Sequence, residues 1–189
     1  CSSDLEFGRT AVYIGGLDDR KGIRFLLEAA QRISQHLPGF KLLIGGSGDL
    51  EGFVQSHVKE GSPIVYLGRI EEKEKALALS ASTLMLIPVW VGLVAVDSLA
   101  AQVPIVTTFH PSHSPEFDYL VNQETAIIVQ YDVDIYSRSV LNLLADPELI
   151  ARLSKNCVTG LGSLSIEEMA SNFVVGITSW RYATRLLSN

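Results

Sequence analysis

The chain alternates short runs of β-branched and other apolar residues with longer stretches in which apolar residues recur at helical spacing. Continuous apolar runs are typical of strands buried on both faces, and helices between such strands predict a parallel sheet. The runs with strand character are residues 11–17, 40–44, 64–67, 83–87, 104–108 and 125–130. The predicted fold is therefore α/β: a Rossmann-like three-layer sandwich with about six mainly parallel strands.

After Tyr131 the pattern becomes almost wholly helical, which predicts a helical C-terminal tail with a break around residues 160–163. Within this tail an apolar stripe recurs at helical spacing: Ile166, Met169, Phe173, Ile177 and Trp180. The stripe either packs on the flank of the sheet or crosses towards another domain. Neither repeats nor a convincing linker divide the sequence, so residues 1–189 are predicted to form one domain.

Composition narrows the possible functions. Hydrophobic residues make up 47% and charged residues 19%, and the net charge of −6 argues against a nucleic-acid surface. The longest apolar run, residues 84–96, contains Pro88 and is too short to span a membrane. Two cysteines without a spacing motif and the lack of an opening signal peptide lead us to expect a cytoplasmic protein.

Glycine-rich turns follow the first two predicted strands. Gly15 and Gly16 end the first, and Gly46 and Gly48 lie just beyond the second. In a parallel sheet the carboxyl ends of the strands share one edge, where helix N-termini favour anions, so we expect a phosphate ligand there. The second turn loosely matches a dinucleotide fingerprint but lacks the spacing to a ribose-binding acid, which makes an NAD enzyme the weaker alternative.

Four segments, in order and at the expected separations, resemble the C-terminal domain of family 4 glycosyltransferases, which have the GT-B fold. They are GGLDDRKG at 15–22, LLIGGSG at 42–48, residues 64–70, and residues 88–106 with the following Ser-Pro-Glu at 114–116. The resemblance covers roughly residues 12–129. It implies the donor-binding half of a retaining hexosyltransferase, whose donor is a UDP- or GDP-linked sugar and which uses no cofactor and no metal.

The resemblance also assigns roles at the diphosphate. Lys21 is implied as the cation that stabilises the departing diphosphate, a task for which fixed charges and backbone N–H groups are suited. The competing interpretation is a solvated surface lysine. In relatives, an arginine at the position of Gly16 accompanies this lysine. That arginine is absent here, and Arg20 is a partial substitute for it.

At the nucleoside end, Asp97 is implied to accept hydrogen bonds from the ribose hydroxyls, with an exposed helix-face aspartate as the alternative. Arg69 and Ile70 close the segment that borders the nucleobase pocket in relatives.

At the sugar end, the first acid of the family signature falls at Val89, and a valine cannot accept a hydroxyl. Either sugar recognition has moved, or the chain belongs to a branch with a different loop. Gly92, Leu93 and Val94 offer amides at a helix N-terminus to the diphosphate or the sugar, although strand-to-helix packing would also explain them.

Glu116 is implied to contact the sugar, or it only favours the start of a short helix. His110 and His113 precede it in the same loop and could hold a metal. Because a third ligand is missing from the pattern, polar loop residues are the preferred interpretation.

A GT-B enzyme has a second, N-terminal domain that binds the acceptor, and this sequence leaves no room for one. We therefore expect a missing acceptor-binding partner and an isolated half that is inactive. Two alternatives remain: a degenerate nucleotide-sugar module that pairs with an active subunit, and a GT-B-like epimerase. The epimerase would need a convergent acid/base set, and the pattern offers none.

Overall fold

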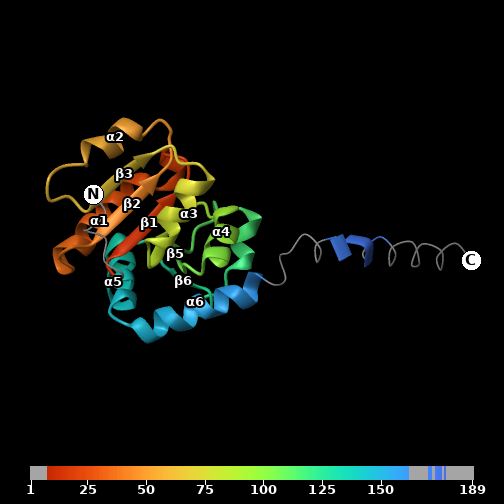
Figure 1. Ribbon diagram of the computed structural model, residues 1–189. Helices are drawn as coiled ribbons and strands as arrows, with labels where there is room; N and C mark the ends of the chain where they lie inside the picture. The colour runs from red at the N-terminus through yellow and green to blue at the C-terminus, as the bar shows by residue number, and fades with distance from the viewer. Residues whose placement is uncertain (1–7, 162–169, 172, 176, 178–189) are drawn as a thin grey trace, which may run out of the picture.

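The computed structural model describes residues 8–161, 170–171, 173–175 and 177 (Figure 1). Its strands are β1 (Thr10–Ile14), β2 (Lys41–Gly45), β3 (Ile64–Gly68), β4 (Leu84–Leu86), β5 (Ile105–Thr108) and β6 (Ala126–Val129). Its α-helices are α1 (Ile23–His36), α2 (Glu51–Ser56), α3 (Glu72–Ser80), α4 (Val94–Ala101), α5 (Val133–Leu144) and α6 (Pro147–Leu161). Two short 3-10 helices complete the set, η1 (Asp19–Lys21) and η2 (Pro115–Tyr119).

The sheet has six strands in the order β3-β2-β1-β4-β5-β6, and all of its paired strands are parallel. Val12 of the central strand β1 pairs with Leu43 of β2 on one side and with Met85 of β4 on the other. The direction of winding reverses between β1 and β4. In sheets of this kind, ligands bind outside the carboxyl ends of the strands at this switch point.

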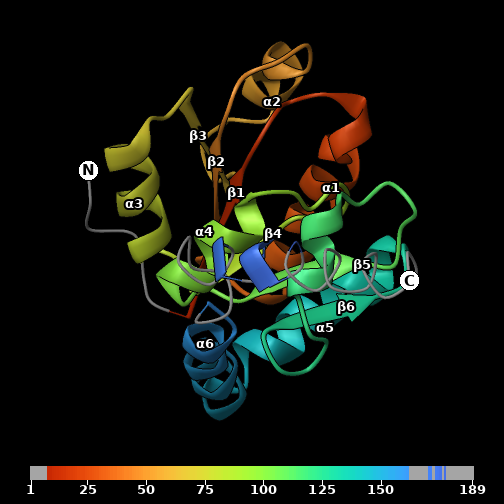
Figure 2. The same ribbon diagram turned by 90° about the vertical axis from the view of Figure 1, so that its right-hand side faces the viewer.

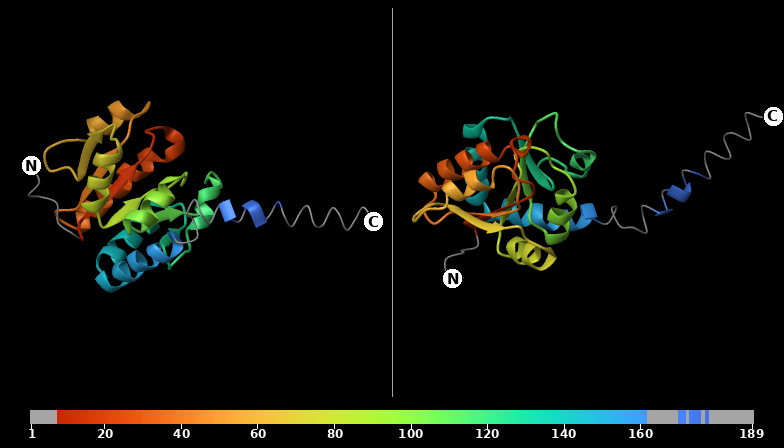
Figure 3. Two further views of the ribbon diagram at one scale, coloured as in Figure 1. Left: turned by 45° about the vertical axis from the view of Figure 1, so that its right-hand side comes forward. Right: turned by 90° about the horizontal axis from the view of Figure 1, so that it is seen from above.

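Helices cover both faces of the sheet, which confirms the three-layer prediction. α1 and α3 lie on opposite sides of β1 and β2 (Figure 2). α5 packs beside α1 on one face, and α4 lies with α3 on the other, with α6 against α4 (Figure 3).

The apolar periodicity explains this arrangement. On α1 apolar residues at helical spacing are buried against the sheet: Ile23, Leu26, Leu27, Ala30 and Ile33. Residues 11–13 of β1 are buried on both faces, as the continuous apolar run predicted. In the described residues, these helices and strands form one hydrophobic core, and the loops at the carboxyl edge of the sheet extend from it.

Several predicted boundaries need correction. The first strand ends at Ile14 rather than Leu17, because Ile14 is the last residue paired with β2. The small and apolar residues at 91–101 predict a helix over that whole range, but α4 starts only at Val94, and the Val91 N–H before it donates to His113 Nδ1. The short helix predicted near residues 116–120 is the 3-10 helix η2.

The helical tail is confirmed by α5 and α6. α6 continues through Leu161, so the predicted break around residues 160–163 does not begin at Gly160, and its remainder lies outside the described residues. Of the predicted apolar stripe, Phe173 and Ile177 are described and exposed, which does not support packing on the flank of the sheet. The other three members lie outside the described residues. Across the described ranges, no helix combines the length and the apolar character needed to cross a membrane.

Candidate functional site

A cavity of about 190 Å³ lies at the switch point, between the carboxyl ends of β1 and β4. Its walls come from the turn after β1, from η1 and from the loop between β4 and α4. The lining residues are Tyr13, Ile14, Gly15, Lys21, Ile87, Trp90, Gly92, Leu93 and Val94. Five of these, Gly15, Lys21, Gly92, Leu93 and Val94, are predicted site residues.

The turn after β1 is built to present Lys21. Asp18 caps η1, because its Oδ1 accepts hydrogen bonds from the N–H groups of Arg20 at 2.9 Å and Lys21 at 3.2 Å. Gly22 follows at φ 68°, a left-handed conformation that glycine adopts without strain, and lets α1 start immediately. A Cβ at Gly22 would lie 3.1 Å from Cγ2 of Val89, so the two loops of the site are in close contact there.

The Lys21 ammonium makes neither an ion pair nor a hydrogen bond within the described part of the chain. Its Nζ instead lies 5.1 Å from the centre of the Trp90 ring. Burial lowers the pKa of Lys21 from its ordinary value, the nearby Asp18 carboxylate raises it, and the Arg20 charge lowers it further, with a net decrease. A half-buried cation of this kind is stabilised by an added anion.

The opposite wall is held in place by the loop after β5. The Thr108 hydroxyl donates to the Pro88 carbonyl at 2.6 Å, and the Ser114 N–H donates to the Val91 carbonyl at 3.0 Å. His113 bridges the two loops: its Nδ1 accepts from the Val91 N–H at 2.9 Å, so its Nε2 carries the proton and donates to the Thr108 carbonyl at 2.8 Å.

These contacts make His113 a neutral structural residue. Burial is the main cause that lowers its pKa below the ordinary value, and its ring stacks on Phe117 with centroids 4.2 Å apart. His110 accepts a hydrogen bond from the Ser112 N–H. Within residues 8–161 and the described part of the tail, no group of three or more His, Cys, Asp or Glu side chains could hold a metal ion.

Beside Lys21, the cavity is lined by three residues whose N–H groups are not hydrogen-bonded within the described residues. Gly92, Leu93 and Val94 precede or open α4, and in the described residues their N–H groups have no hydrogen-bond acceptor. Such groups at a helix N-terminus favour negative charge. The cavity therefore combines one partly desolvated cation with free N–H donors, an environment suited to a phosphate.

Close packing between the two turns explains the glycines at positions 46 and 48. A Cβ at Gly46 would lie 1.8 Å from the Gly15 carbonyl oxygen, and one at Gly48 would lie 2.5 Å from the Leu17 carbonyl oxygen. The Gly15 N–H donates to the carbonyl of Gly45, the last residue of β2, and the Leu17 N–H donates to the Ser47 carbonyl, so hydrogen bonds join the first turn to the second. Gly46 and Gly48 do not line the cavity; Gly46 packs on Gly15, which does, and Gly48 packs on Leu17.

Asp97, Arg69 and Ile70 lie outside the cavity. On α4, Asp97 Oδ1 accepts from the Lys75 ammonium of α3 at 3.0 Å, and the two side chains are 33% and 21% exposed. Burial lowers the pKa of Lys75, but the hydrogen bonds to Asp97 and Glu72 raise it more, so the net shift is upward. Ile70 packs against Gly45 at the end of β2, while Arg69 is exposed.

Glu116 lies on η2, which packs against α4. Its Oε2 is buried and has no hydrogen-bond partner among the described residues. A buried carboxylate oxygen without a partner is unfavourable, so a ligand hydroxyl would stabilise it.

Comparison with known proteins identifies the family. A family model described as glycosyl transferases group 1 matches residues 8–146, well over half of the chain. The chain belongs to the group 1 glycosyltransferases. The predicted resemblance to this family is thereby confirmed.

Curated relatives of this glycosyltransferase chain include phosphatidyl-myo-inositol mannosyltransferases. That of Mycobacterium tuberculosis strain H37Rv is 28% identical over 106 residues, and the match covers 53% of this chain and 28% of the relative. That of Mycobacterium leprae is 29% identical over 112 residues, with the same coverage. The chain thus spans little more than a quarter of these relatives.

Solved structures agree on the fold. The pneumococcal O-GlcNAc transferase GtfA, in complex with UDP and GlcNAc, matches with a TM-score of 0.77 at 14% identity, covering 94% of this chain and 37% of that one. The C-terminal domain of a group 1 glycosyl transferase, LpcC of Francisella tularensis, matches with a TM-score of 0.68 at 17% identity, covering 82% of this chain and 84% of that one. The architecture is that of one half of a GT-B fold.

The structure shows the surroundings of both positions at which this glycosyltransferase chain departs from the family pattern. Val89 is buried at 3% exposure and packs on Gly22, so its side chain belongs to the contact between loops. A Cβ at Gly16 would meet nothing closer than Asp18 Oδ2 at 3.5 Å and Lys21 Cε at 4.0 Å. The place of the missing arginine is therefore open and lies beside Lys21.

Four lining residues are not among the predicted site residues: Tyr13, Ile14, Ile87 and Trp90. The one that contacts the cations of the site is Trp90. It has φ 60°, a left-handed conformation that is rare for a bulky side chain, and it lies within cation–π distance of both Arg20 and Lys21. Its position directly after Val89, inside the family signature, is the signal that could have found it.

Proposed function

We propose that this chain is the donor-binding half of a retaining glycosyltransferase and that its switch-point cavity holds the diphosphate of a UDP- or GDP-linked sugar. The observation that carries the proposal is the Lys21 ammonium, unpaired within the described residues, which shares this cavity with the free amides of Gly92, Leu93 and Val94. Charge that develops on a departing diphosphate is stabilised by such fixed donors without rearrangement.

The size of the cavity supports a phosphate rather than a whole donor. Small-molecule sites commonly enclose about 300–1,000 Å³, whereas this cavity measures about 190 Å³. The nucleoside and the sugar would therefore extend beyond it along the carboxyl edge of the sheet. An acceptor-binding half, as in a complete GT-B enzyme, would close that open side, and on this proposal the isolated chain does not turn over substrate.

The nucleoside and sugar ends have candidate partners. Asp97 could receive the ribose hydroxyls if its ion pair with Lys75 leaves Oδ2 available. Glu116, whose Oε2 has no partner among the described residues, is the candidate for a sugar hydroxyl in place of the acid lost at Val89.

A degenerate nucleotide-sugar module is the second candidate function. It is favoured by the burial of Val89 in the loop contact, because no carboxylate can reach the sugar from that position. Such a module would bind the donor and contribute no turnover even when its acceptor-binding partner is present.

Thermal shift measurements with UDP, GDP and ADP, their sugars and the matching nucleosides test the binding proposal. A ligand that binds the folded state raises the melting temperature by mass action. We expect a shift with one nucleoside diphosphate and a much smaller one with its nucleoside. No shift with any nucleotide at millimolar concentration would contradict the proposal. An activity assay of the chain joined to an acceptor-binding half separates the two candidates. Turnover indicates an enzyme, and donor binding without turnover indicates a degenerate module.

A further inference from the structure

We propose that Trp90 is a positioning residue whose ring holds Arg20 and Lys21 as a pair of cations at the mouth of the switch-point cavity. Arg20 then acts as the second diphosphate cation, in place of the arginine that Gly16 lacks. This inference rests on the proposed function, because it assigns the pair to the diphosphate of the donor.

The distances bring three side chains together from two loops. The Arg20 guanidinium carbon lies 5.5 Å and the Lys21 Nζ 5.1 Å from the centre of the Trp90 ring. Both fall within the range in which a cation is attracted to an indole face. Two like charges beside each other repel, and a shared aromatic ring offsets part of that repulsion without neutralising either charge.

The backbone of Trp90 indicates a role beyond packing. Its φ of 60° is unfavourable for a large side chain, and residues held in such conformations cluster at functional sites. The ring is only partly covered and lines the cavity with Lys21, whereas the neighbouring Val89 and Val91 are buried. The strained residue is therefore the one whose side chain is directed to the site.

The carboxylate beside the pair leaves Lys21 available. Asp18 Oδ1 accepts the N–H groups of Arg20 and Lys21 and forms an ion pair with Arg20 Nε at 3.5 Å, but it forms none with the Lys21 ammonium. Arg24, one turn further on, is also paired, with Asp19 at 3.0 Å, and lies over Phe53 at 4.3 Å rather than over Trp90. Arg24 is thus an ion-paired arginine of the same region that faces a different ring, and it provides a matched control.

Calorimetry measures the affinity of the 189-residue chain for UDP, GDP and their nucleosides. The variants are then compared using the nucleotide, and its nucleoside, whose base the wild-type chain binds. Loss of the ring in Trp90→Leu is expected to weaken diphosphate binding about three- to thirtyfold while the nucleoside is unaffected. Trp90→Phe keeps an aromatic face and should recover most of the loss. Arg20→Gln should weaken the diphosphate by a similar factor, and Arg24→Gln should leave it unchanged.

A double-mutant cycle distinguishes positioning from a general structural effect. If the ring acts through Arg20 and Lys21, the double variant Trp90→Leu with Arg20→Gln loses less than the product of the single losses. Trp90→Gly removes the ring while relaxing the left-handed backbone, so it should keep its melting temperature and still bind the diphosphate weakly. A Trp180→Phe background leaves Trp90 as the sole tryptophan, and its emission should change when inorganic pyrophosphate binds.

The outcomes separate this proposal from the one on which it rests. If the wild-type chain binds no nucleotide, both are wrong. If it binds a diphosphate through Lys21 but Trp90→Leu and Trp90→Gly bind equally well, only the role of Trp90 is overturned. Equal losses for Arg20→Gln and Arg24→Gln would likewise overturn the assignment of Arg20 as the second cation.

Discussion

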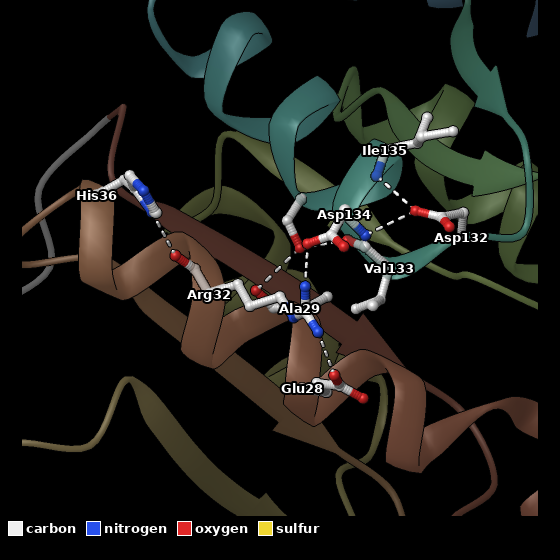
Figure 4. Close-up of polar contacts among 9 residues, drawn as sticks. Glu28, Ala29, Arg32, His36, Asp132, Val133, Asp134 and Ile135 are labelled. Carbon is white, nitrogen blue, oxygen red and sulfur yellow. Dashed lines mark hydrogen bonds and ion pairs between the residues drawn. The ribbon is translucent and has the colours of Figure 1, made fainter.

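Two hollows of the described structure, the groove between α1 and α5 and the switch-point cavity, differ in how one cation in each, Arg32 or Lys21, is paired. The groove between α1 and α5, of about 420 Å³, is more than twice the size of the switch-point cavity, of about 190 Å³. In the groove, Arg32 is paired with Glu28 at 2.6 Å and with Asp134 (Figure 4). In the switch-point cavity, Lys21 has no carboxylate partner in the described residues and faces an indole ring and free amides.

The difference indicates that a partly buried cation without a carboxylate partner, rather than volume, marks the site. Arg138 also lines the groove without an ion pair in the described residues, but it is exposed, whereas Lys21 is half-buried. Beside the groove, Asp132 caps α5 by accepting the N–H groups of Asp134 and Ile135, both at 2.9 Å (Figure 4). An anion entering it would have to compete with the carboxylates of Glu28 and Asp134 for Arg32. An anion entering the switch-point cavity displaces no carboxylate from Lys21.

The largest expected effect is on diphosphate affinity. Lys21→Ala should weaken UDP or GDP binding about 10- to 100-fold, because it removes a charge-assisted hydrogen bond. The nucleoside should bind as before, and calorimetry with both ligands measures the contrast. Arg32→Gln is the matched control in the groove: it should lower the melting temperature slightly and leave nucleotide affinity unchanged. Equal losses in the two variants would remove the distinction between the hollows.

The next effect concerns the contact between the two loops of the site. Gly22→Ala should destabilise the fold by about 1–2 kcal/mol, because alanine is strained in the left-handed conformation, and its Cβ would press on Val89. Urea denaturation measures the change. Gly52→Ala, on α2, meets nothing within 4 Å and should be neutral or stabilising. A loss at Gly52 as large as that at Gly22 would contradict the account of the loop contact.

A smaller, opposite effect is expected from restoring the missing cation. Gly16 has an ordinary φ and open space beside Lys21. Gly16→Arg should therefore fold and should tighten diphosphate binding several-fold, about 1 kcal/mol. Gly16→Gln is the uncharged control. Tighter binding in the glutamine variant as well would show that contact, and not charge, is responsible.

The smallest expected effect is on the pH dependence of stability. Burial lowers the pKa of His113 in the folded state, so between that value and the ordinary 6.5 the unfolded chain binds more protons. The contribution of neutral His113 to the free energy of unfolding should therefore be fully present above about pH 6.5. It should be lost as the pH falls through the pKa of His113 in the folded state. The His113→Gln variant should lose this part of the pH dependence in urea titrations, and an unchanged profile would mean that another group is responsible.

The sequence was sufficient for the fold because the signal is local and periodic. Apolar runs such as residues 11–13 and the stripe on α1 fix the strands, the helices and the face that each helix buries. The order of strands and helices then places the glycine turns and Lys21 at one edge of the sheet. The sequence alone therefore predicts that these residues lie near a phosphate site.

The details that the sequence did not predict depend on contacts between distant residues. The Val91 N–H, just before α4, is bonded to His113, which lies 22 residues further along the chain. Asp97 is bonded to Lys75, also 22 residues away, and nothing in the local pattern around either residue indicates this ion pair. Trp90 becomes a site residue only because its backbone is left-handed and because η1 brings Arg20 and Lys21 against its ring.

The central claim is that the switch-point cavity binds the diphosphate of the donor. The most direct measurement is an amide NMR titration of the chain with the nucleoside diphosphate that produces the largest thermal shift. We predict that the largest shifts occur at the amides of Gly92, Leu93 and Val94 and at the Trp90 indole N–H, while Arg32 and Asp134 are unaffected. Shifts centred on the α1–α5 groove, with the amides at the start of α4 unchanged, would contradict the account.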